Sequence, residues 1–350
     1  MFTIKKWLSL ATLAIGGALG PNAPVLATTE LTVSSWLPPG YFFMSRVLRP
    51  WAESVERETE GRVKVVILPA ALGRPAAAFD VVRQGQADIS YGVHGYQPGR
   101  FELSKAVELP FTGNHGEAVA AAYWRIYKKY FEQAGEHRGV QVLSVYTHTP
   151  GHIFHTMRPM TTMEDLQGQK MRVSGGIVNE VAQALGFSPL MQPASEVYQV
   201  LANRVADGVL FTNDSIEGFK LSSVIAHSTQ IPGGLYNTSF FFIMNEEKFR
   251  GLTKEDQDTI MRLSGENYAR MAGRSFDEMA ANAFEHMEGH NIEVQTASDG
   301  LLDAIRERTS PVEASWVEQA EKRGVDGRKA LDELRSIAME ISAEIESRKP

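Results

Sequence analysis

The feature that most restricts the fold of this chain is a regular alternation of strand and helix patterns near its beginning. Strand patterns at 31–36, 62–68 and 87–91 are separated by helix patterns at 42–60 and 76–84. Gly61 and Pro69 lie where one pattern gives way to the next. Parallel neighbouring strands must be joined by a crossover, usually a helix, so this order is typical of a parallel sheet covered by helices. We therefore predict an α/β fold.

The alternation continues along the chain, which predicts a second sheet. Strand patterns occur at 140–146, 152–157, 170–173, 208–211 and 240–244, with helix patterns at 117–133, 161–168, 177–185 and 195–203. Thr161 and Glu164 form a capping-box pattern at the start of one of these helices. A helix pattern of roughly 35 residues runs from Thr253 to about Gly289 and would span about 50 Å.

Two lobes are expected, because single hydrophobic cores stop growing at roughly 250–300 residues. No linker rich in proline, glycine and serine separates the two sets of strands, so strands that cross between the lobes must form a hinge. The long helix pattern would span this hinge. The predicted fold is therefore a two-lobed α/β fold, with lobe I at 28–149 plus 237–280 and lobe II at 150–236 plus 281–350.

The first 27 residues have the pattern of a cleavable export signal. Lys5 and Lys6 precede a short apolar run, and the small-residue site Val25-Leu26-Ala27 follows. A membrane anchor would need about 20 continuous apolar residues, whereas Pro21 and Pro24 interrupt this run. We expect cleavage after Ala27 and an exported mature chain.

Charge and cysteine content exclude several classes of protein. The net charge of −7 becomes −9 once residues 1–27, with two lysines and no acids, are removed. An acidic chain without a basic cluster is a poor partner for nucleic acid. The absence of cysteine excludes disulfide bonds, a cysteine nucleophile and a lipid-modified N-terminal cysteine.

The sequence offers little support for an enzyme. It contains no Gly-x-Ser-x-Gly, no phosphate-binding loop and no His-Glu-x-x-His motif. His148, His152 and His155 lie close together, but Pro150 and Gly151 prevent helical spacing and no acidic residue completes a metal-ligand set. We predict no metal and no cofactor, and keep a hydrolase that uses the histidine cluster as an alternative.

Arg172 is the strongest candidate for ligand binding. It lies at the end of a short strand pattern, and Ser174-Gly175-Gly176 then lead into a helix whose N-terminal amides favour an anion. Arginine offers a planar pair of donors to a carboxylate, which lysine cannot reproduce. The other reading of an arginine at a strand end is a surface ion pair.

The stretch from Met163 to Val173 resembles the most characteristic segment of the DctP-type substrate-binding proteins of TRAP transporters. Three further segments are similar to this family in order and spacing, and they lie at 84–89, 195–209 and 242–252. The resemblance covers essentially the whole mature chain. It implies a periplasmic receptor that closes on a small organic acid and delivers it to the integral membrane subunits of a transporter.

The resemblance also assigns roles to individual residues. Arg172 corresponds to the carboxylate clamp, and His152 falls where many relatives carry a second basic residue. Trp36 and Phe211 fall where sugar-acid binders are polar, which favours an aromatic or branched monocarboxylate, with a 2-oxo or 2-hydroxy group, over a sugar acid. A ligand-sensing protein remains the other alternative.

Three further ligand-binding candidates come from position alone. Tyr91, His94 and Tyr236 lie at predicted carboxyl ends of strands, where open α/β sheets bind their ligands.

Overall fold

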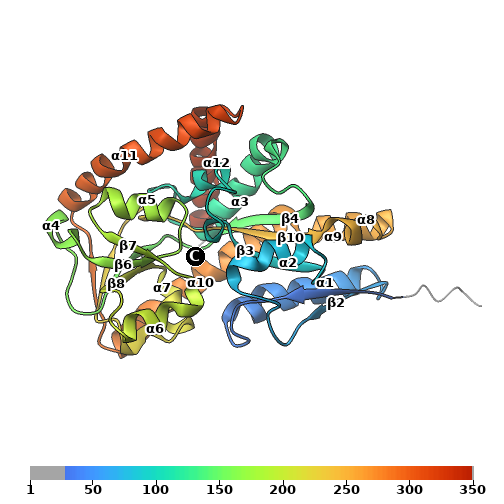
Figure 1. Ribbon diagram of the computed structural model, residues 1–350, viewed down its shortest axis with the longest axis horizontal. Helices are drawn as coiled ribbons and strands as arrows, with labels where there is room; N and C mark the ends of the chain where they lie inside the picture. Colours follow the sequence, from blue (N-terminus) through green and yellow to red (C-terminus); the bar gives the residue numbers. More distant parts are fainter. Residues whose placement is uncertain (1–27, 349–350) are drawn as a thin grey trace, which may run out of the picture.

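Two mixed β-sheets organise the chain (Figure 1), and the computed structural model describes residues 28–348. The first sheet has the order β2 (Val63–Ile67), β1 (Thr29–Ser34), β3 (Ile89–Val93), β10 (Ser239–Asn245) and β4 (Val140–Thr147). β2, β1 and β3 are parallel, as the alternation predicted, whereas β10 runs antiparallel to both of its neighbours. Every residue of β3 is buried, which is typical of a strand that is covered on both faces.

The second sheet contains three strands that the sequence patterns did not reveal. Its order is β11 (Glu293–Thr296), β9 (His227–Gln230), β5 (His152–His155), β8 (Gly208–Phe211), β6 (Lys170–Val173) and β7 (Ser188–Met191). β7, β9 and β11 were missed because each has only four residues, and because β9 and β11 are mostly polar and β7 contains Pro189. β7 and β11 lie at the edges of the sheet. β5 is antiparallel to both neighbours, and the other pairs are parallel.

Helices cover both sheets. A π-helical turn at Met44–Leu48 precedes α1, so the predicted helix at 42–60 is two segments. Around the first sheet lie α1 (Arg49–Glu58), α2 (Ala78–Arg83), α3 (Gly116–Ile126), α8 (Glu246–Arg250) and α9 (Lys254–Leu263). Around the second lie α4 (Met163–Leu166), α5 (Ile177–Ala184), α6 (Val197–Ala202) and α7 (Asn213–Gly218). α10 (Gly265–Gly289), α11 (Asp299–Lys322) and α12 (Gly327–Ser347) complete the chain.

The lobes are joined by two crossing segments that pair with each other. One crossing follows β4 and the other precedes β10. The Gly151 amide donates to the Tyr236 carbonyl at 2.8 Å, and the Leu235 amide donates to the Gly151 carbonyl at 3.0 Å. A side chain on Gly151 would collide with the Tyr236 ring, so this close pairing requires glycine. The crossings therefore form a short antiparallel hinge rather than a flexible tether.

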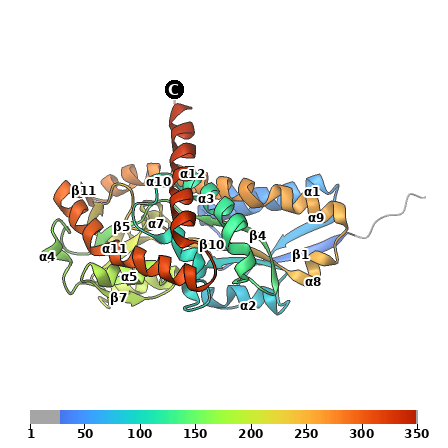
Figure 2. The same ribbon diagram turned by 90° about the horizontal axis from the view of Figure 1, so that it is seen from above.

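α10 is the long helix that spans both lobes, as predicted, but it is shorter than the sequence pattern. It packs against α3 and β4 of one lobe and against α7 of the other (Figure 2). The prediction of one helix from Thr253 to Gly289 was wrong, because Ser264 leaves the helical conformation (φ −98°, ψ −143°) and Gly265 has φ +56°. The Ser264 hydroxyl accepts from the Trp51 indole at 3.1 Å, which holds the chain in this bend.

Two smaller differences concern the remaining helices. The capping box of α4 is formed by Thr162 and Asp165, one residue beyond the predicted pair. α11 packs on α5, and α12 packs on α3 and projects beyond the lobes in Figure 2. The segment that we assigned to lobe II therefore touches both lobes, and the exact lobe boundaries stay a prediction. None of the helices between residues 28 and 348 is long and apolar enough to cross a membrane.

The crossing of α10 over α3 generates a test of the fold. A Cβ atom on Gly273 would lie 2.5 Å from the carbonyl carbon and oxygen of Gly116, so alanine would force the helices apart. Gly273→Ala should lower the free energy of unfolding by about 1–3 kcal/mol, as other overpacked cores do. Gly300 in α11 has open space around it, and Gly300→Ala is the matched control. Equal thermal unfolding of the two variants would contradict the close crossing.

Candidate functional site

A cavity lies between the two lobes, at the hinge, and its volume is about 50 Å³. Eleven of its twenty lining residues are Phe, Tyr or Trp, and only one is a lysine or arginine. Its aromatic lining residues are Trp36, Tyr41, Phe43, Tyr91, Tyr96, Tyr146, Phe211, Phe219, Tyr236, Phe240 and Phe276. This lining suits a small, mainly apolar molecule with one charged group.

Arg172 supplies the single cation of the cavity. Its side chain comes from the carboxyl end of β6 and is 1% exposed. Nε and Nη2 donate to the Gln192 carbonyl at 2.9 and 2.6 Å, while Nη1 has no partner among residues 28–348. The guanidinium carbon lies 5.0 Å from the centre of the Phe211 ring. A buried cation without an acidic partner is costly, so this arrangement favours an anion in the cavity.

Trp36 and Tyr91 form one wall of the cavity, and each has a fixed position. The Trp36 indole donates to the Tyr91 carbonyl at 3.0 Å, and the two rings lie 5.9 Å apart. The Tyr91 hydroxyl is 2.6 Å from the Ser35 hydroxyl. On the opposite lobe, Phe211 packs 5.4 Å from Phe219. The walls are therefore preorganised apolar surfaces rather than loose side chains.

Contacts between the lobes close the cavity. The Tyr41 hydroxyl of the first lobe donates to Asp214 of α7 at 3.0 Å. The Ala194 amide of the second lobe donates to the Tyr96 hydroxyl at 2.8 Å. The Ile177 amide, at the start of α5, donates to the buried Glu108 carboxylate at 3.0 Å. These bonds tie both lobes around the lining residues, so water has little access.

Burial also changes the acidity of groups around the cavity. It raises the pKa of the Asp214 carboxyl to about 6, and the Thr212 and Tyr41 hydroxyls reduce this effect. Burial raises the pKa of the Tyr236 hydroxyl above its ordinary value, although the nearby Arg172 charge opposes this. Tyr236 therefore stays a neutral donor that can join Arg172 in binding an anion.

The structure brings five of the seven predicted residues together, and these are Arg172, Trp36, Phe211, Tyr91 and Tyr236.

His152 lies on the other side of the hinge, in an open groove with Asp277 and Phe284. Its Nδ1 accepts from the Ile231 amide at 3.1 Å, and burial lowers the pKa of the imidazole to about 3. His152 was predicted to bind the ligand at the position of the relatives' second basic residue, but it does not line the cavity.

His94 joins a buried chain of hydrogen bonds behind the cavity. Its Nδ1 lies 3.0 Å from the Ser239 hydroxyl, which donates to Glu108 at 2.6 Å. Its Nε2 lies 2.9 Å from Nε2 of His137. Burial and the neighbouring His137 hold the pKa of His94 well below its ordinary value. His94 therefore ties β3 to β10 instead of facing the cavity.

The three histidines that are close in sequence have separate environments. His148 lines the cavity, whereas His152 lies in the open groove. His155 accepts from the amides of Met157 and Arg158 at 3.1 Å. Between residues 28 and 348, no group of three or more histidine, aspartate or glutamate side chains is placed to hold a metal.

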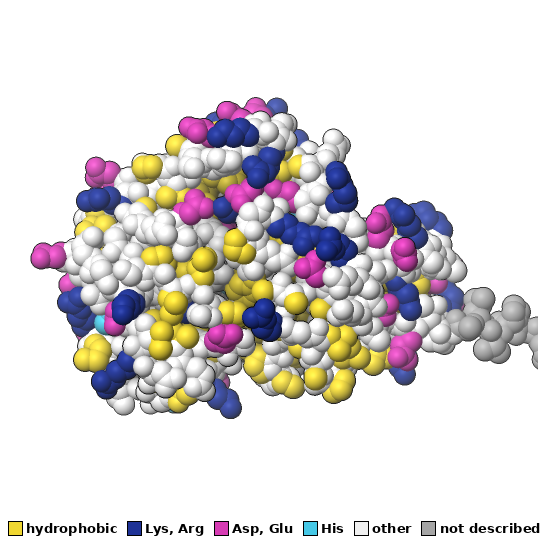
Figure 3. All heavy atoms as spheres, in the orientation of Figure 1, with side chains coloured by type: hydrophobic (Ala, Val, Ile, Leu, Met, Phe, Trp, Pro, Cys, Tyr) yellow, Lys and Arg dark blue, Asp and Glu magenta, His cyan; other side chains and the backbone are white. Residues whose placement is uncertain are grey.

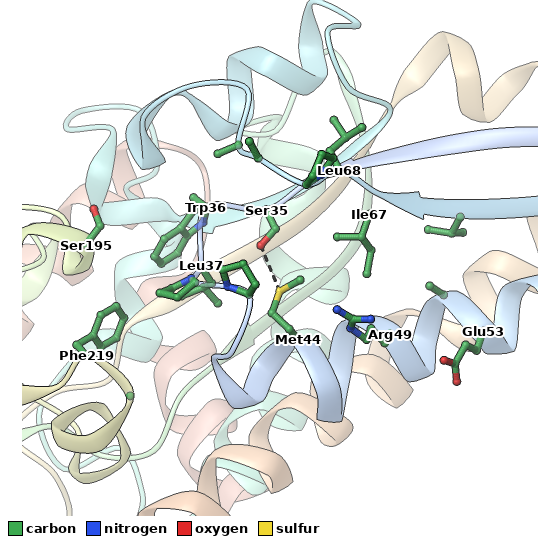
Figure 4. A pocket seen from close by; sticks show the side chains of 18 of the residues that line it. Ser35, Trp36, Leu37, Met44, Arg49, Glu53, Ile67, Leu68, Ser195 and Phe219 are labelled. Atoms are coloured by element: carbon green, nitrogen blue, oxygen red, sulfur yellow. Dashed lines mark hydrogen bonds between the residues drawn. The ribbon is translucent and has the colours of Figure 1, made fainter.

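A second, open groove lies beside the cavity, between β2 and α1 (Figure 4). Ile67 and Leu68 line one side and Arg49 and Glu53 the other, and Trp36 separates the groove from the cavity. Its charged side chains are exposed to water, so the groove lacks the unpaired buried cation of the cavity. Lysine and arginine side chains are interspersed with acidic ones on the face in Figure 3, without a basic patch there.

Several lining residues were missed in the sequence. Tyr96, Phe219 and Phe276 lie in turns and helices where no strand end marked them. His148 was considered only as part of a metal cluster. The available signal for it was its position two residues after the strand predicted at 140–146.

Two α/β lobes close over a buried arginine that has no acidic partner among the described residues. This arrangement is that of an extracytoplasmic solute receptor of the periplasmic-binding-protein class. The chain belongs to the DctP family, described as bacterial extracellular solute-binding protein, family 7, whose model matches residues 34–320. The predicted fold and the predicted receptor for a small organic acid of the TRAP type are confirmed.

Similar proteins support this assignment over about nine-tenths of the chain. A TRAP periplasmic solute-binding protein of Bordetella bronchiseptica, with bound (R)- and (S)-mandelate, is 44% identical with a TM-score of 0.88, covering 89% of this chain and 99% of that one. A marine metagenome TRAP protein in complex with metahydroxyphenylacetate is 30% identical with a TM-score of 0.83 over 89% and 99% of the two chains. The outer membrane transporter protein TsaT of Comamonas testosteroni is 29% identical over 94% of this chain and 97% of its own length.

The burial of His152 predicts how stability changes with pH. Its pKa falls from 6.5 to about 3 in the folded protein, so the unfolded chain takes up the proton more readily. The stabilisation is present above pH 6.5 and is lost as the pH falls toward 3. As the pH falls from 6.5 to 5, protonation of His152 in the unfolded chain should lower the free energy of unfolding by about 2 kcal/mol.

His152→Asn, which keeps an acceptor for the Ile231 amide, should reduce this loss in denaturant unfolding measured across that range. His290→Asn, at an exposed histidine, is the control and should keep the original pH dependence. The same slope in all three proteins would show that His152 is not desolvated.

Proposed function

We propose that this protein is the periplasmic receptor of a TRAP transporter for an aromatic monocarboxylate. The observation that carries the proposal is the Arg172 guanidinium, which is buried without an acidic partner in a cavity with mainly aromatic walls. A ligand carboxylate would offset the cost of that buried charge. The effect is strong because the closed lobes exclude water and lower the effective dielectric constant.

The geometry of Arg172 indicates which donors meet the ligand. Gln192 uses the edge formed by Nε and Nη2. The remaining edge, formed by Nη1 and the second hydrogen of Nη2, can still offer two parallel donors to a carboxylate. We infer that the carboxylate binds end-on at this edge and that the Tyr236 hydroxyl donates to it.

The aromatic body of the ligand is inferred from the walls. Trp36, Phe211 and Phe219 present apolar surface, and aromatic side chains pack well against aromatic rings. Unpaired hydroxyls of a sugar acid would cost about 1–3 kcal/mol each against such walls. A second carboxylate would find no second lysine or arginine in the lining. The relatives with bound mandelate and metahydroxyphenylacetate support this class of ligand.

The partners and the export route belong to the same proposal. Family membership supports delivery of the ligand to the integral membrane subunits of the transporter, rather than to a signalling protein, and supports binding without turnover. Residues 1–27 lie outside the described residues, and we propose that they are the cleaved signal. Co-purification of the exported protein with a multi-span membrane protein would separate transport from sensing.

Substitution of Arg172 tests the ligand site. Arg172→Ala should weaken mandelate binding by about 100-fold or more, because breaking a desolvated ion pair costs about 3–5 kcal/mol. Arg172→Lys should also weaken it, since lysine lacks the two parallel donors. Arg49→Ala, at an exposed arginine of the neighbouring groove, should bind normally. Titration calorimetry that found normal affinity for Arg172→Ala would remove the cavity as the binding site.

A panel of acids tests the class of ligand. Aromatic monocarboxylates such as mandelate and phenylacetate should raise the melting temperature most, C4-dicarboxylates less, and hexuronic or sialic acids least. The physical reason is the single cation combined with apolar walls. A sugar acid that gave the largest shift would show that Trp36 and Phe211 do not select the ligand.

A further inference from the structure

His148 lies in the wall of the binding cavity without a role in holding the ligand carboxylate. It directly follows β4, at the start of the first hinge crossing, and is 6% exposed. Three aromatic rings surround its imidazole at steep angles, and their centres lie 5.9 Å (Tyr236), 5.8 Å (Phe240) and 6.1 Å (Phe276) away. This packing fixes the ring, so its two nitrogens have fixed positions relative to the cavity.

The hydrogen bonding of His148 determines which nitrogen carries the proton. Nδ1 contacts the Thr149 carbonyl oxygen, and a carbonyl oxygen can only accept, so Nδ1 must donate. Burial lowers the pKa of the imidazole from 6.5 to about 4, with a smaller contribution from the nearby Arg172 charge, so the ring is neutral near pH 7. Nε2 then has a lone pair, and within residues 28–348 it has no hydrogen-bond partner.

The other polar groups of the cavity differ from His148 in one respect. Thr212 and Ser215 bond to each other at 2.8 Å, and Arg172 only donates. The hydroxyl of Thr238, like any hydroxyl, can rotate to donate or to accept. A neutral imidazole has one N–H proton, and in His148 this proton lies on Nδ1 and is donated to Thr149. Among the lining side chains of residues 28–348, His148 is therefore the one with a free polar atom, Nε2, that can accept a hydrogen bond but cannot donate one.

We propose that Nε2 of His148 is the acceptor for a hydroxyl group of the ligand, and that it makes the receptor selective for hydroxy-substituted aromatic acids. This inference rests on the proposed function. A ligand hydroxyl would donate a hydrogen bond to the Nε2 lone pair. An oxo group cannot donate, and its own lone pair would face that of Nε2. An unsubstituted ligand would leave the acceptor without a partner in a dry cavity, which also weakens binding.

Matched ligands test the inference on the unmodified protein by calorimetry. Mandelate should bind about three- to tenfold more tightly than phenylacetate, which lacks the hydroxyl, and more tightly than benzoylformate, which has an oxo group in its place. If His148 instead binds a hydroxyl on the aromatic ring, 3-hydroxyphenylacetate should have the same advantage over phenylacetate. Comparing mandelate and 3-hydroxyphenylacetate, each with phenylacetate, therefore shows whether the bound hydroxyl is beside the carboxylate or on the ring. Equal affinities within both pairs would overturn the inference, and this arm does not depend on the folding of any variant.

A pair of variants assigns the effect to Nε2. His148→Asn keeps a donor for the Thr149 carbonyl but has no atom at the position of Nε2. It should reduce the preference for the hydroxy acid to about one. His148→Gln, whose amide reaches the Nε2 position, should restore part of the preference. A preference that His148→Asn leaves intact would show that another group binds the hydroxyl and would overturn the inference.

Failure of the proposed function gives a different result. If the unmodified protein binds none of these aromatic acids, the proposed function fails and this inference fails with it. If it binds them all but the ratios do not depend on residue 148, only the inference fails.

Discussion

The rest of the site depends on one buried cation that has no acidic partner in the described chain. The Arg172 side chain is held by the Gln192 carbonyl and lies against Phe211, yet Nη1 is left without a partner. Most buried charges in proteins are paired, because an unpaired charge in an apolar environment is expensive. A receptor can sustain that cost because the ligand completes the pair. The same unpaired charge that destabilises the ligand-free protein provides binding energy for an anion.

This cation acts only when the lobes are closed, which links binding to the hinge. The bonds from Tyr41 to Asp214 and from Ala194 to Tyr96 cross the cleft and hold walls from different lobes together. The paired crossings at Gly151 and Tyr236 restrict how the lobes can move. α10 contacts both lobes and limits the motion further. Closure then dries the cavity, and a dry cavity strengthens the interaction between Arg172 and a carboxylate.

The histidines show how neighbouring residues acquire separate roles. His148 and His152 are four positions apart, but the chain crosses the hinge between them. One ring therefore lines the cavity, and the other bonds the Ile231 amide on the far side. Burial lowers the pKa of both rings, so neither supplies a positive charge near pH 7. Selectivity near His148 then depends on a lone pair rather than on a charge.

The sequence by itself determined the α/β class and the two-lobed fold, because these depend on local patterns. It also singled out Arg172 as a candidate, because its short strand leads into a glycine pair. Periodicity reports the faces of each element, so the buried strands β3 and β10 were visible in advance. Edge strands such as β7 were not, since β7 has only four residues, one of them Pro189, and none of them is fully buried. The break in the helix at Ser264 was not predicted either, because contacts with residues distant in the sequence, such as Trp51, stabilise it.

Only the tertiary structure decided which side chains meet in the cavity. Trp36, Phe211 and Tyr236 come from different parts of the chain, and the fold places them around Arg172. It also places His94 and His152 outside the cavity, although they lie near strand ends in the sequence, as the residues that line the cavity do. The physical reason is that a strand pattern predicts where a strand ends but not which side of the hinge the next residue faces. That direction is set by the pairing of Gly151 with Tyr236, which joins residues far apart in the sequence.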